Sequence, residues 1–330
     1  MRSLSLTLDT GTSNTRVRAW RDSQLLGGKD VPVGVRDTAR TGSHDILRAG
    51  VREAIQSTLR SIDANASELA LVVGSGMVTS KLGLHELPHS VAPARIDELA
   101  AGMQSAQFED ILAAPIWFIP GVRHDAAPLA IGRASEMDMM RGEETEVIDL
   151  LNKITIDRDA LILLPGSHAK FVEVDGDATI LRSLTTLSGE MLDLLMHQSV
   201  LASGLKQGWP EALDPDALLA GARASRKESL SRAAFLVRAL ELFSPAAESA
   251  RFSFLLGAVL VQDLMSCMAG NMWVSGRPFF ICGRPMMQRA YAAVAQGVLG
   301  IASIVTPDQN TLAELAGHGA LAIARRRGLL

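Results

Sequence analysis

The chain has 330 residues, of which 48% are hydrophobic and 21% charged, with a formal net charge of −4 at pH 7. Because single cores usually divide below this length, we expect two domains. The balance of 32 basic and 36 acidic residues excludes the strongly positive surface of proteins that bind nucleic acid or anionic lipid.

The ends and the cysteines indicate a cytoplasmic protein. Only Arg2 precedes the first strand-like run, which is not the pattern of a signal peptide. The longest apolar run, residues 252–261, is too short to cross a bilayer. Cys267 and Cys282 lie in apolar surroundings without metal-ligand spacing, so we expect two reduced thiols.

The sequence opens with a strand and a polar turn. Leucines alternate with hydroxyl residues over residues 3–8, a period of two that predicts a half-buried strand ending at Asp9. A second strand is expected at 17–20. The turn between them offers closely spaced N–H groups and short donors, which suit a phosphate, from Gly11, Thr12, Ser13 and Asn14. Asp9 is placed to hold a metal, although an ordinary hairpin with a polar turn is the alternative.

Residues 161–174 repeat this plan. An apolar strand runs into a turn formed by Pro165, Gly166, Ser167 and His168. Lys170 follows, and a second strand leaves with Phe171 and Val172. Two phosphate-type hairpins half a chain apart favour two similar domains that grip one nucleotide between them.

Between the hairpins, a buried strand at 69–73 is expected to stop at a loop formed by Gly74, Ser75, Gly76 and Met77. Ligands bind at such loops in α/β proteins, although a plain strand-to-helix turn is the alternative. The neighbouring segments are expected as a strand (24–33), a helix capped by Ser43 (43–62), a loop or short strand (82–95), a helix (96–106), a strand (116–119) and irregular chain (126–140).

A helix at 141–151 opens with Glu143 and Glu144, acids that suit a first helical turn. The later segments are expected as a strand (179–184), a turn with a helix cap (185–190), a helix (191–201), helices within 214–272 broken at 244–245, a strand (279–282), a helix to 296, a strand (301–305) and a helix (312–324). The helix at 254–272 could belong to the core or to a homodimer interface. This order favours an α/β fold with domains 1–150 and 151–330.

Three motifs together resemble the 2-dehydro-3-deoxygalactonokinases: the turn from Asp9 to Arg16, the run 140–145 with Arg141-Gly142-Glu143-Glu144-Thr145, and the turn 165–172. Within the first motif, Asp9-x-Gly11 alone is shared by all sugar kinases of the actin and hexokinase superfamily, whereas the other two motifs, one following the other, are more specific. The resemblance runs in order from residue 4 to about residue 198, with a weaker echo to the end. Thr10 and Phe171 stand where the family commonly has Trp.

The resemblance implies a two-domain actin-like, ribonuclease H-like ATPase fold with a duplicated β-sheet core and an interdomain cleft. It implies transfer of the γ-phosphoryl group of ATP to the terminal hydroxyl of 2-dehydro-3-deoxy-D-galactonate, with Mg²⁺, in galactonate degradation. The partners would be this sugar acid and ATP, without nucleic acid or membrane. The alternatives are a kinase for another sugar or sugar acid and an actin-like protein that binds nucleotide without catalysis.

The same resemblance implies roles for individual residues. Asp9 would hold Mg²⁺ directly or through its waters. The phosphates would meet Gly11, Thr12, Ser13, Asn14, Gly166, Ser167 and His168. Lys170 would neutralise developing charge, although an exposed hairpin Lys is the alternative. Gly283 would let adenosine approach the backbone, beside Arg284.

The acceptor hydroxyl must lose its proton, so a carboxylate should lie within reach of it. Glu143 or Glu144 fits by position, Asp125 competes, and the sequence does not choose between the two Glu residues. A bidentate clamp on the substrate carboxylate could come from Arg16, Arg123 or Arg141, although structural salt bridges are the alternative. The sugar itself would contact Ser75, Gly76 and Met77.

Overall fold

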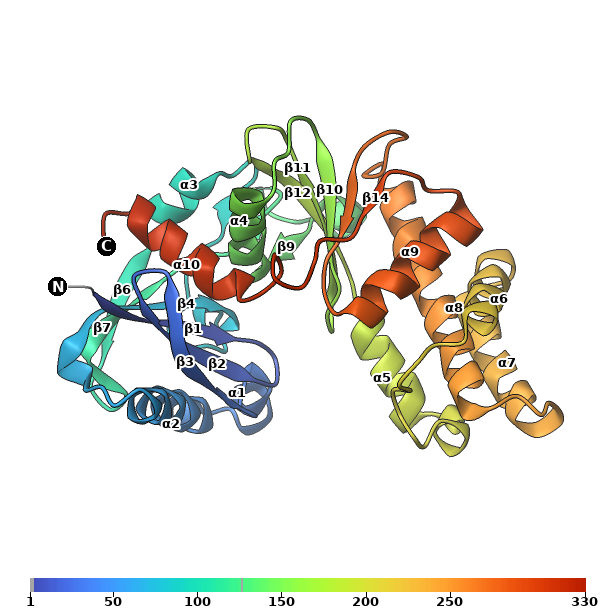
Figure 1. Cartoon of the computed structure of the whole chain (residues 1–330), viewed down its shortest axis with the longest axis horizontal. Coiled ribbons are helices and arrows are strands. Elements are labelled where there is room, and N and C mark those ends of the chain that lie inside the picture. Colours follow the sequence, from blue (N-terminus) through green and yellow to red (C-terminus); the bar gives the residue numbers. More distant parts are fainter. Residues whose placement is uncertain (1–2, 126) are drawn as a thin grey trace. The chain divides into compact units, whose positions relative to one another are not determined.

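In the computed structural model, which describes residues 3–125 and 127–330, the chain forms two compact units (Figure 1). Unit 1 contains the chain up to Asp157 together with Asp175–Ser183 and Ala313–Leu330. Unit 2 contains Arg158–Val174 and Leu184–Leu312. The units therefore differ from a division at residue 150, because two later segments return to pack with the first. Residues 2 and 126, named above, lie outside the described residues.

Unit 1 is built on a six-stranded sheet of order β3-β2-β1-β4-β7-β6. Its strands are β1 (Leu4–Thr10), β2 (Thr15–Arg21), β3 (Gln24–Val31), β4 (Leu69–Gly76), β6 (Gln104–Phe108) and β7 (Leu112–Phe118). β1 is antiparallel to β2 and parallel to β4, with Asp9 opposite Ser75 and Thr10 opposite Gly76. The carboxyl ends of β1 and β4 therefore lie side by side at one edge of the sheet.

Helices pack on this sheet or on one another beside it (Figure 1). They are α1 (Val35–Thr41), α2 (Asp45–Ser61), α3 (Ile96–Ala101), α4 (Glu143–Lys153) and α10 (Leu315–Arg326), with short 3₁₀ turns at Ala66–Glu68, Met77–Thr79 and Ile131–Glu136. α2 packs on β2 and β3, whereas α10 contacts β1, β4, α3 and α4. A small second sheet joins β5 (Ser90–Val91), β8 (Val122–Arg123) and β9 (Met139–Met140).

The prediction that the first strand is half-buried is wrong. Ser5 and Thr7, on the face expected to meet solvent, are buried along with the leucines. Tertiary packing accounts for the difference, because β1 is a central strand and α10 covers the second face of the sheet. The hydroxyl of Thr7 accepts a hydrogen bond from Trp20 Nε1 at 2.8 Å, so its burial leaves no unsatisfied group.

Three further boundaries differ from expectation. The supposed loop at 74–76 is the end of β4, since this segment pairs with β1. The helix expected at 96–106 ends at Ala101, and the chain turns at Gly102 into the edge strand β6. Residues 185–186 continue a strand, β12, instead of forming the predicted turn. The short helix α1 was not predicted.

The second sheet, of order β12-β11-β10-β13-β14, is formed mainly by unit 2, although the first residues of β12 belong to the segment Asp175–Ser183 of unit 1. Its strands are β10 (Ala160–Leu164), β11 (Ala169–Val174), β12 (Ile180–Thr186), β13 (Phe279–Ile281) and β14 (Ile304–Val305). The helices of unit 2 are α5 (Ser188–Gln198), α6 (Pro215–Lys227), α7 (Leu230–Phe243), α8 (Glu248–Ala269) and α9 (Pro285–Leu299), with a 3₁₀ turn at Val200–Gly204. β10 is antiparallel to β11 and parallel to β13, as β1 is to β2 and β4. Both predicted hairpins are thus present.

The helix α8 contains the longest apolar run and is the core helix of unit 2. Within the described residues it alone is long and apolar enough, by length and composition, to cross a membrane. The helix is therefore longer than the apolar run at 252–261, which by itself is too short to cross a bilayer. Most of its length is buried, and it packs against α5, α6, α7 and α9. Its hydrophobicity is accounted for by the core of the unit.

Candidate functional site

Three segments of unit 1 converge on the carboxylate of Asp9. β1 ends with Asp9 and Thr10, β4 ends with Gly76, and Gly142 precedes α4. A Cβ on Gly76 would lie 2.9 Å from Asp9 Oδ1, and one on Gly142 would lie 3.1 Å from the Gly76 Cα. Both glycines have positive φ, +78° and +118°. Only Gly fits such conformations at such separations, so the three backbones can approach the same carboxylate.

Backbone hydrogen bonds hold the turn of the first hairpin in place. Gly11 N donates to Asn14 O at 2.8 Å, which closes the turn. The first N–H groups of α1 donate to its carbonyls, with Val35 N to Gly11 O at 3.2 Å and Arg36 N to Thr12 O at 2.9 Å. The side chains of Thr12, Ser13 and Asn14 stay partly or fully exposed. An anchored turn with accessible donors is suited to binding an anion.

Acids at the start of α4 share this edge with Asp9. Burial raises the pKa of Asp9, and the nearby Glu143 carboxylate raises it further, whereas Arg16 opposes the shift with Nη1 3.3 Å from Asp9 Oδ2. Burial also raises the pKa of Glu146 to about 8, with added effects of Asp9 and Glu143. Concentrated negative charge of this kind is relieved by a bound cation.

The donor set at this edge fits Mg²⁺. Carboxylate oxygens are the ligands that this ion prefers, and it usually takes only one or two of them while keeping several waters. Among residues 3–125 and 127–330, no group of three or more His, Cys, Asp or Glu forms a ready-made ligand set. Asp9, whose side chain is 26% exposed, is accessible to an ion that keeps most of its water.

Glu143 and Glu144 have different surroundings. Glu144 is buried, and both of its carboxylate oxygens accept hydrogen bonds from Gly142 N, at 2.9 and 2.7 Å. Burial raises its pKa to about 8. Glu143 is partly exposed, and its Oε2 accepts from Arg141 N at 3.0 Å. Glu143 is therefore accessible to a substrate, whereas Glu144 is folded back on its own helix start.

Sequence reasoning missed Glu146. It follows Glu143 by three positions, so the two side chains lie on the same face of α4. The i, i+3 spacing from Glu143, a predicted base, was a signal available in the sequence.

The substitution Glu146→Gln should flatten the pH dependence of stability in unit 1. An acid whose folded pKa is raised contributes stability that is present below its ordinary value of 4.5 and lost as the pH rises through about 8. Because Gln imitates the neutral acid, we expect the variant to be about 1–2 kcal/mol more stable than the wild type at pH 8 and similar at pH 5. Urea unfolding without divalent metal measures both. The exposed control Glu136→Gln should show no such difference, and an unchanged pH slope for Glu146→Gln would contradict this assignment.

The predicted sugar-binding loop is less open than expected. Ser75 is 1% exposed within β4, and Gly76 is also buried. Met77, which begins the 3₁₀ turn, is partly exposed. As the structure stands, Met77 is the accessible side chain of the three.

The three candidate arginines lie in different settings. The Arg141 guanidinium donates to Thr79 O and Oγ1, at 2.5 and 2.6 Å, and to Leu87 O at 3.1 Å. It therefore braces the turn after β4, and burial lowers its pKa. Arg123 lies in β8 of the small sheet. Arg16 is 55% exposed beside Asp9, which leaves it the most accessible to a substrate.

Asp125, the competing base, lies in the loop after β8. Its carboxylate accepts from Ala127 N at 2.9 Å and pairs with Arg133 at 3.3 Å. Together with residues 127–137 it lines a small cavity of that loop. None of these contacts joins it to Asp9 or Glu143.

In unit 2, the second hairpin leaves Gly166 and Ser167 exposed at its tip. Lys170, 6% exposed, donates from Nζ to Thr185 Oγ1 at 2.7 Å. It is therefore not the exposed hairpin Lys of the alternative interpretation. His168 Nε2 lies 3.1 Å from Glu190 Oε2, which is consistent with an orienting contact.

The N-terminus of α5 packs directly on this hairpin. Glu190 N donates to Ser167 O at 2.9 Å. A Cβ on Gly189 would lie 2.2 Å from Gly166 O and 2.9 Å from the Ser167 Cα. The helix start and the hairpin tip are held together by this close approach, and the partial positive charge of the helix end favours a nearby phosphate.

The substitution Gly189→Ala should separate the hairpin tip from α5. The added methyl group meets backbone, which cannot rotate away, so we expect a loss of about 1–3 kcal/mol of stability. Affinity for nucleotide should also fall. Thermal melting and nucleotide titration measure these effects. Gly208→Ala, whose Cβ would meet nothing within 4 Å, controls for the loss of a glycine in the same unit, although its positive φ adds local strain. A Gly189→Ala protein as stable as the wild type would contradict the close packing.

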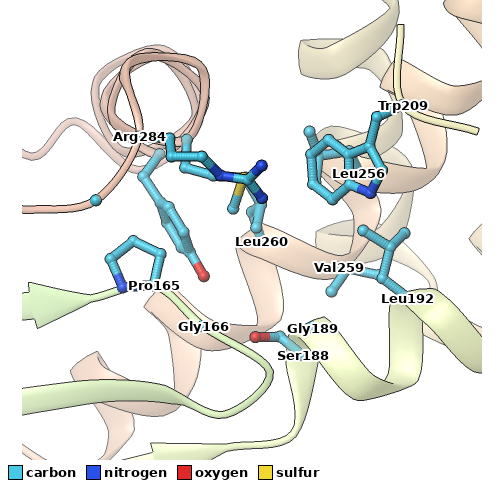
Figure 2. A pocket seen from close by; sticks show the side chains of 13 residues that line it. Pro165, Gly166, Ser188, Gly189, Leu192, Trp209, Leu256, Val259, Leu260 and Arg284 are labelled. Atoms are coloured by element: carbon cyan, nitrogen blue, oxygen red, sulfur yellow. The ribbon is translucent and has the colours of Figure 1, made fainter. Parts of the chain in front are cut away.

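A cavity of about 180 Å³ opens beside the second hairpin (Figure 2). This is more than ten times the roughly 10–15 Å³ that one water needs on the same measure. Its lining includes both predicted adenosine contacts and the hairpin tip: Pro165, Gly166, Ser188, Gly189, Leu192, Trp209, Leu256, Val259, Leu260, Gly283, Arg284, Met287 and Tyr291. Apolar side chains dominate, with few polar groups, as in pockets for small molecules and cofactors. Sequence reasoning found the glycine turns but not Trp209 or the helix residues.

Comparisons with known proteins agree with this architecture. A sequence model of the family described as 2-keto-3-deoxy-galactonokinase matches residues 9–317. A solved structure of a "putative 2-dehydro-3-deoxygalactonokinase protein" from Sinorhizobium meliloti is 21% identical, with a TM-score of 0.75 and coverage of 97% of this chain and 98% of that one. Component A of (R)-2-hydroxyglutaryl-CoA dehydratase from Acidaminococcus fermentans is 10% identical, with a TM-score of 0.51 and coverage of 98% and 99%. No curated protein sequence matches the chain significantly.

Proposed function

Because the chain belongs to the 2-keto-3-deoxy-galactonokinase family, whose members are carbohydrate kinases, we propose that its acceptor is 2-dehydro-3-deoxy-D-galactonate. The γ-phosphoryl group of ATP would be transferred to the terminal hydroxyl of this acid, giving the 6-phosphate. The observation that supports the chemistry is the edge of unit 1 at which Asp9, Gly76 and the start of α4 meet.

Phosphoryl transfer asks a protein mainly for positioning and for charge neutralisation. At this edge Asp9 would hold Mg²⁺, through its waters or directly, and the ion would neutralise charge on the phosphates. Gly11, Thr12, Ser13 and Asn14 would donate to phosphate oxygens from the anchored turn.

Glu143 is the base that the geometry favours. Its carboxylate is partly exposed and lies close enough to Asp9 to affect the pKa of that group. The carboxylate of Glu144 already accepts hydrogen bonds from Gly142 N, and Asp125 is paired with Arg133. Glu143 would accept the proton of the acceptor hydroxyl as the phosphoryl group arrives. Arg16 would bind the carboxylate of the sugar acid, with Met77 beside the sugar.

Unit 2 would bind the donor nucleotide. Gly166, Ser167 and His168 would contact phosphates, and Lys170 would neutralise charge near the group transferred. The cavity next to them would take the nucleoside, with Gly283 and Arg284 in its lining. We also propose that ATP is the phosphoryl donor and Mg²⁺ the metal cofactor. The reaction would belong to galactonate degradation, and the protein would be cytoplasmic.

A coupled ADP-release assay over a panel of aldonic and 2-keto-3-deoxy acids tests the acceptor. We expect the galacto-configured keto acid to give the highest kcat/KM. A higher value for another sugar or sugar acid would reassign the acceptor while keeping the kinase. Nucleotide binding without turnover of any panel member would instead favour a nucleotide-binding protein without this activity.

A further inference from the structure

Unit 2 buries a carboxylate that the proposed mechanism does not use. Asp263, in α8, is 3% exposed. Its Oδ2 accepts a hydrogen bond from the Tyr291 hydroxyl at 2.6 Å, and the side chains of Thr186 and Ser188 also hydrogen-bond this carboxylate. Burial raises the pKa of Asp263, and the three hydroxyls oppose this by stabilising the ionised form. Within the described residues Asp263 forms no ion pair, so hydroxyl donors alone compensate its charge.

Four elements meet at this carboxylate. Thr186 ends β12, Ser188 begins α5, and Tyr291 lies in α9. The hydroxyls also contact one another, since Thr186 Oγ1 lies 3.3 Å from Ser188 Oγ and Ser188 hydrogen-bonds Tyr291. The next residue, Gly189, packs on the tip of the second hairpin. The cluster therefore holds the start of α5 at the place where that helix meets the hairpin.

Asp263 determines where the hydroxyl protons of the cluster point. An ionised carboxylate only accepts hydrogen bonds, whereas a hydroxyl has one proton to donate and lone pairs that accept. Because the protons of Ser188 and Tyr291 are taken up inside the cluster, the oxygens of these residues keep lone pairs for other partners. Both residues line the cavity of about 180 Å³. They are 6% and 1% exposed, so a ligand in the cavity would meet buried hydrogen-bond acceptors.

These acceptors lie at the hairpin end of the cavity. Figure 2 shows Ser188 beside Gly166 and Gly189, whereas Trp209 and Leu256 lie on the other side. In a nucleotide the ribose is joined directly to the phosphates, and the base lies beyond it. With the phosphates at the hairpin tip, the ribose is the part that reaches the acceptors, and the base occupies the apolar part of the cavity.

From this arrangement we propose that Ser188 and Tyr291 accept hydrogen bonds from the ribose hydroxyls of the bound nucleotide, and that Asp263 is the residue that positions them. The site then selects ribonucleotides over nucleotides that lack a ribose hydroxyl, because a missing donor leaves a buried acceptor unpaired. The inference deepens the proposed function and rests on it in one respect, since it takes the cavity to hold the donor nucleotide.

Calorimetric titrations of the full chain with ADP, 2′-deoxy-ADP and 3′-deoxy-ADP test this selection without a sugar acid. At least one deoxynucleotide should bind roughly 5- to 150-fold more weakly than ADP, the range for a buried acceptor left without its donor. The fluoro nucleotide modified at the same carbon has no proton to donate there and should bind as weakly. Equal affinities for ADP and both deoxynucleotides, or a fluoro nucleotide that binds like ADP, would overturn the inference.

The ratio of the deoxynucleotide and ADP dissociation constants shows which residues are responsible. At least one of Ser188→Ala and Tyr291→Phe should remove the difference between the two nucleotides, because the acceptor is gone. Asp263→Asn should lower the ratio for the fluoro nucleotide, since an amide can donate to a hydroxyl oxygen and turn the hydroxyl proton toward the cavity. A purely structural role of Asp263 would weaken all nucleotides alike, and an unchanged ratio in Asp263→Asn would overturn the positioning role.

Ser253→Ala is the matched control, since Ser253 is another buried, hydrogen-bonded serine of unit 2 and does not line the cavity. It should leave the ratio unchanged, and thermal melting shows whether each variant is folded. If Asp263→Asn does not fold, Ser188→Ala and Tyr291→Phe still decide the inference: a ratio retained in both would overturn it. Turnover of the keto acid with MgATP is a separate arm. Its absence, with the expected nucleotide ratio present, would remove the proposed function and leave the inference standing.

Discussion

The substitution Glu143→Gln should lower kcat by about 10²- to 10⁴-fold, the range for a lost general base, with little change in nucleotide affinity. Gln keeps the size and the hydrogen-bonding reach of the side chain but cannot accept the proton of the acceptor hydroxyl. The helix start should survive, because Glu143 is partly exposed and its contact to Arg141 N can be made by an amide oxygen. Steady-state kinetics with the keto acid and a nucleotide titration measure the two quantities separately.

Glu144→Gln is the informative comparison. Its carboxyl accepts from Gly142 N and is buried, so we expect its substitution to act mainly on stability and on the position of the helix start. A loss of kcat in Glu144→Gln as large as that in Glu143→Gln, with an unchanged melting temperature, would reverse the assignment. Retained turnover in both variants would remove these residues from the role of base.

The substitution Asp9→Asn should reduce kcat/KM by about 10²- to 10⁴-fold, because the metal is expected to supply several kcal/mol of charge stabilisation to the transition state. An amide oxygen is neutral and a weaker ligand for a hard cation. Loss of the negative charge also frees Arg16 from its contact with Asp9. The activity that remains should need a higher concentration of Mg²⁺ for half-saturation.

A metal titration of turnover for the wild type and Asp9→Asn measures this shift. Asp30→Asn serves as the control, since Asp30 is a second carboxylate near Arg16, at 3.9 Å, without contact to the turn of the first hairpin. It should leave the Mg²⁺ requirement unchanged. Equal Mg²⁺ requirements for the wild type and Asp9→Asn would contradict the role of Asp9 as the metal ligand.

Local motifs made much of the fold predictable. The turns at 11–14 and 165–168, and the acids that open α4, are set by residues close in sequence, and the structure has each of them. The burial of β1 on both faces could not be predicted in this way. It depends on α10, which returns to unit 1 from about three hundred residues further along the chain.

The candidate site, like the fold, could be predicted from the sequence only where short motifs determine it. Asp9, Glu143 and the glycines at 76 and 142 are set by short motifs, and their convergence follows from the parallel pairing of β1 and β4. The inward turn of Glu144 and the bracing of the β4 turn by Arg141 are tertiary contacts without a sequence signal. Trp209 reaches the cavity from an irregular segment before α6, and no periodicity marks it.

Transfer of the phosphoryl group to the terminal oxygen of the six-carbon keto-deoxy acid can be seen in the product itself. Two-dimensional ¹H–³¹P correlation of the product formed from 2-dehydro-3-deoxy-D-galactonate and MgATP identifies the carbon that carries the phosphate. We expect one phosphomonoester whose phosphorus couples to the two protons on C6. Inorganic phosphate as the sole product, or a phosphoester that couples to protons elsewhere on the acid, would rule out this reaction.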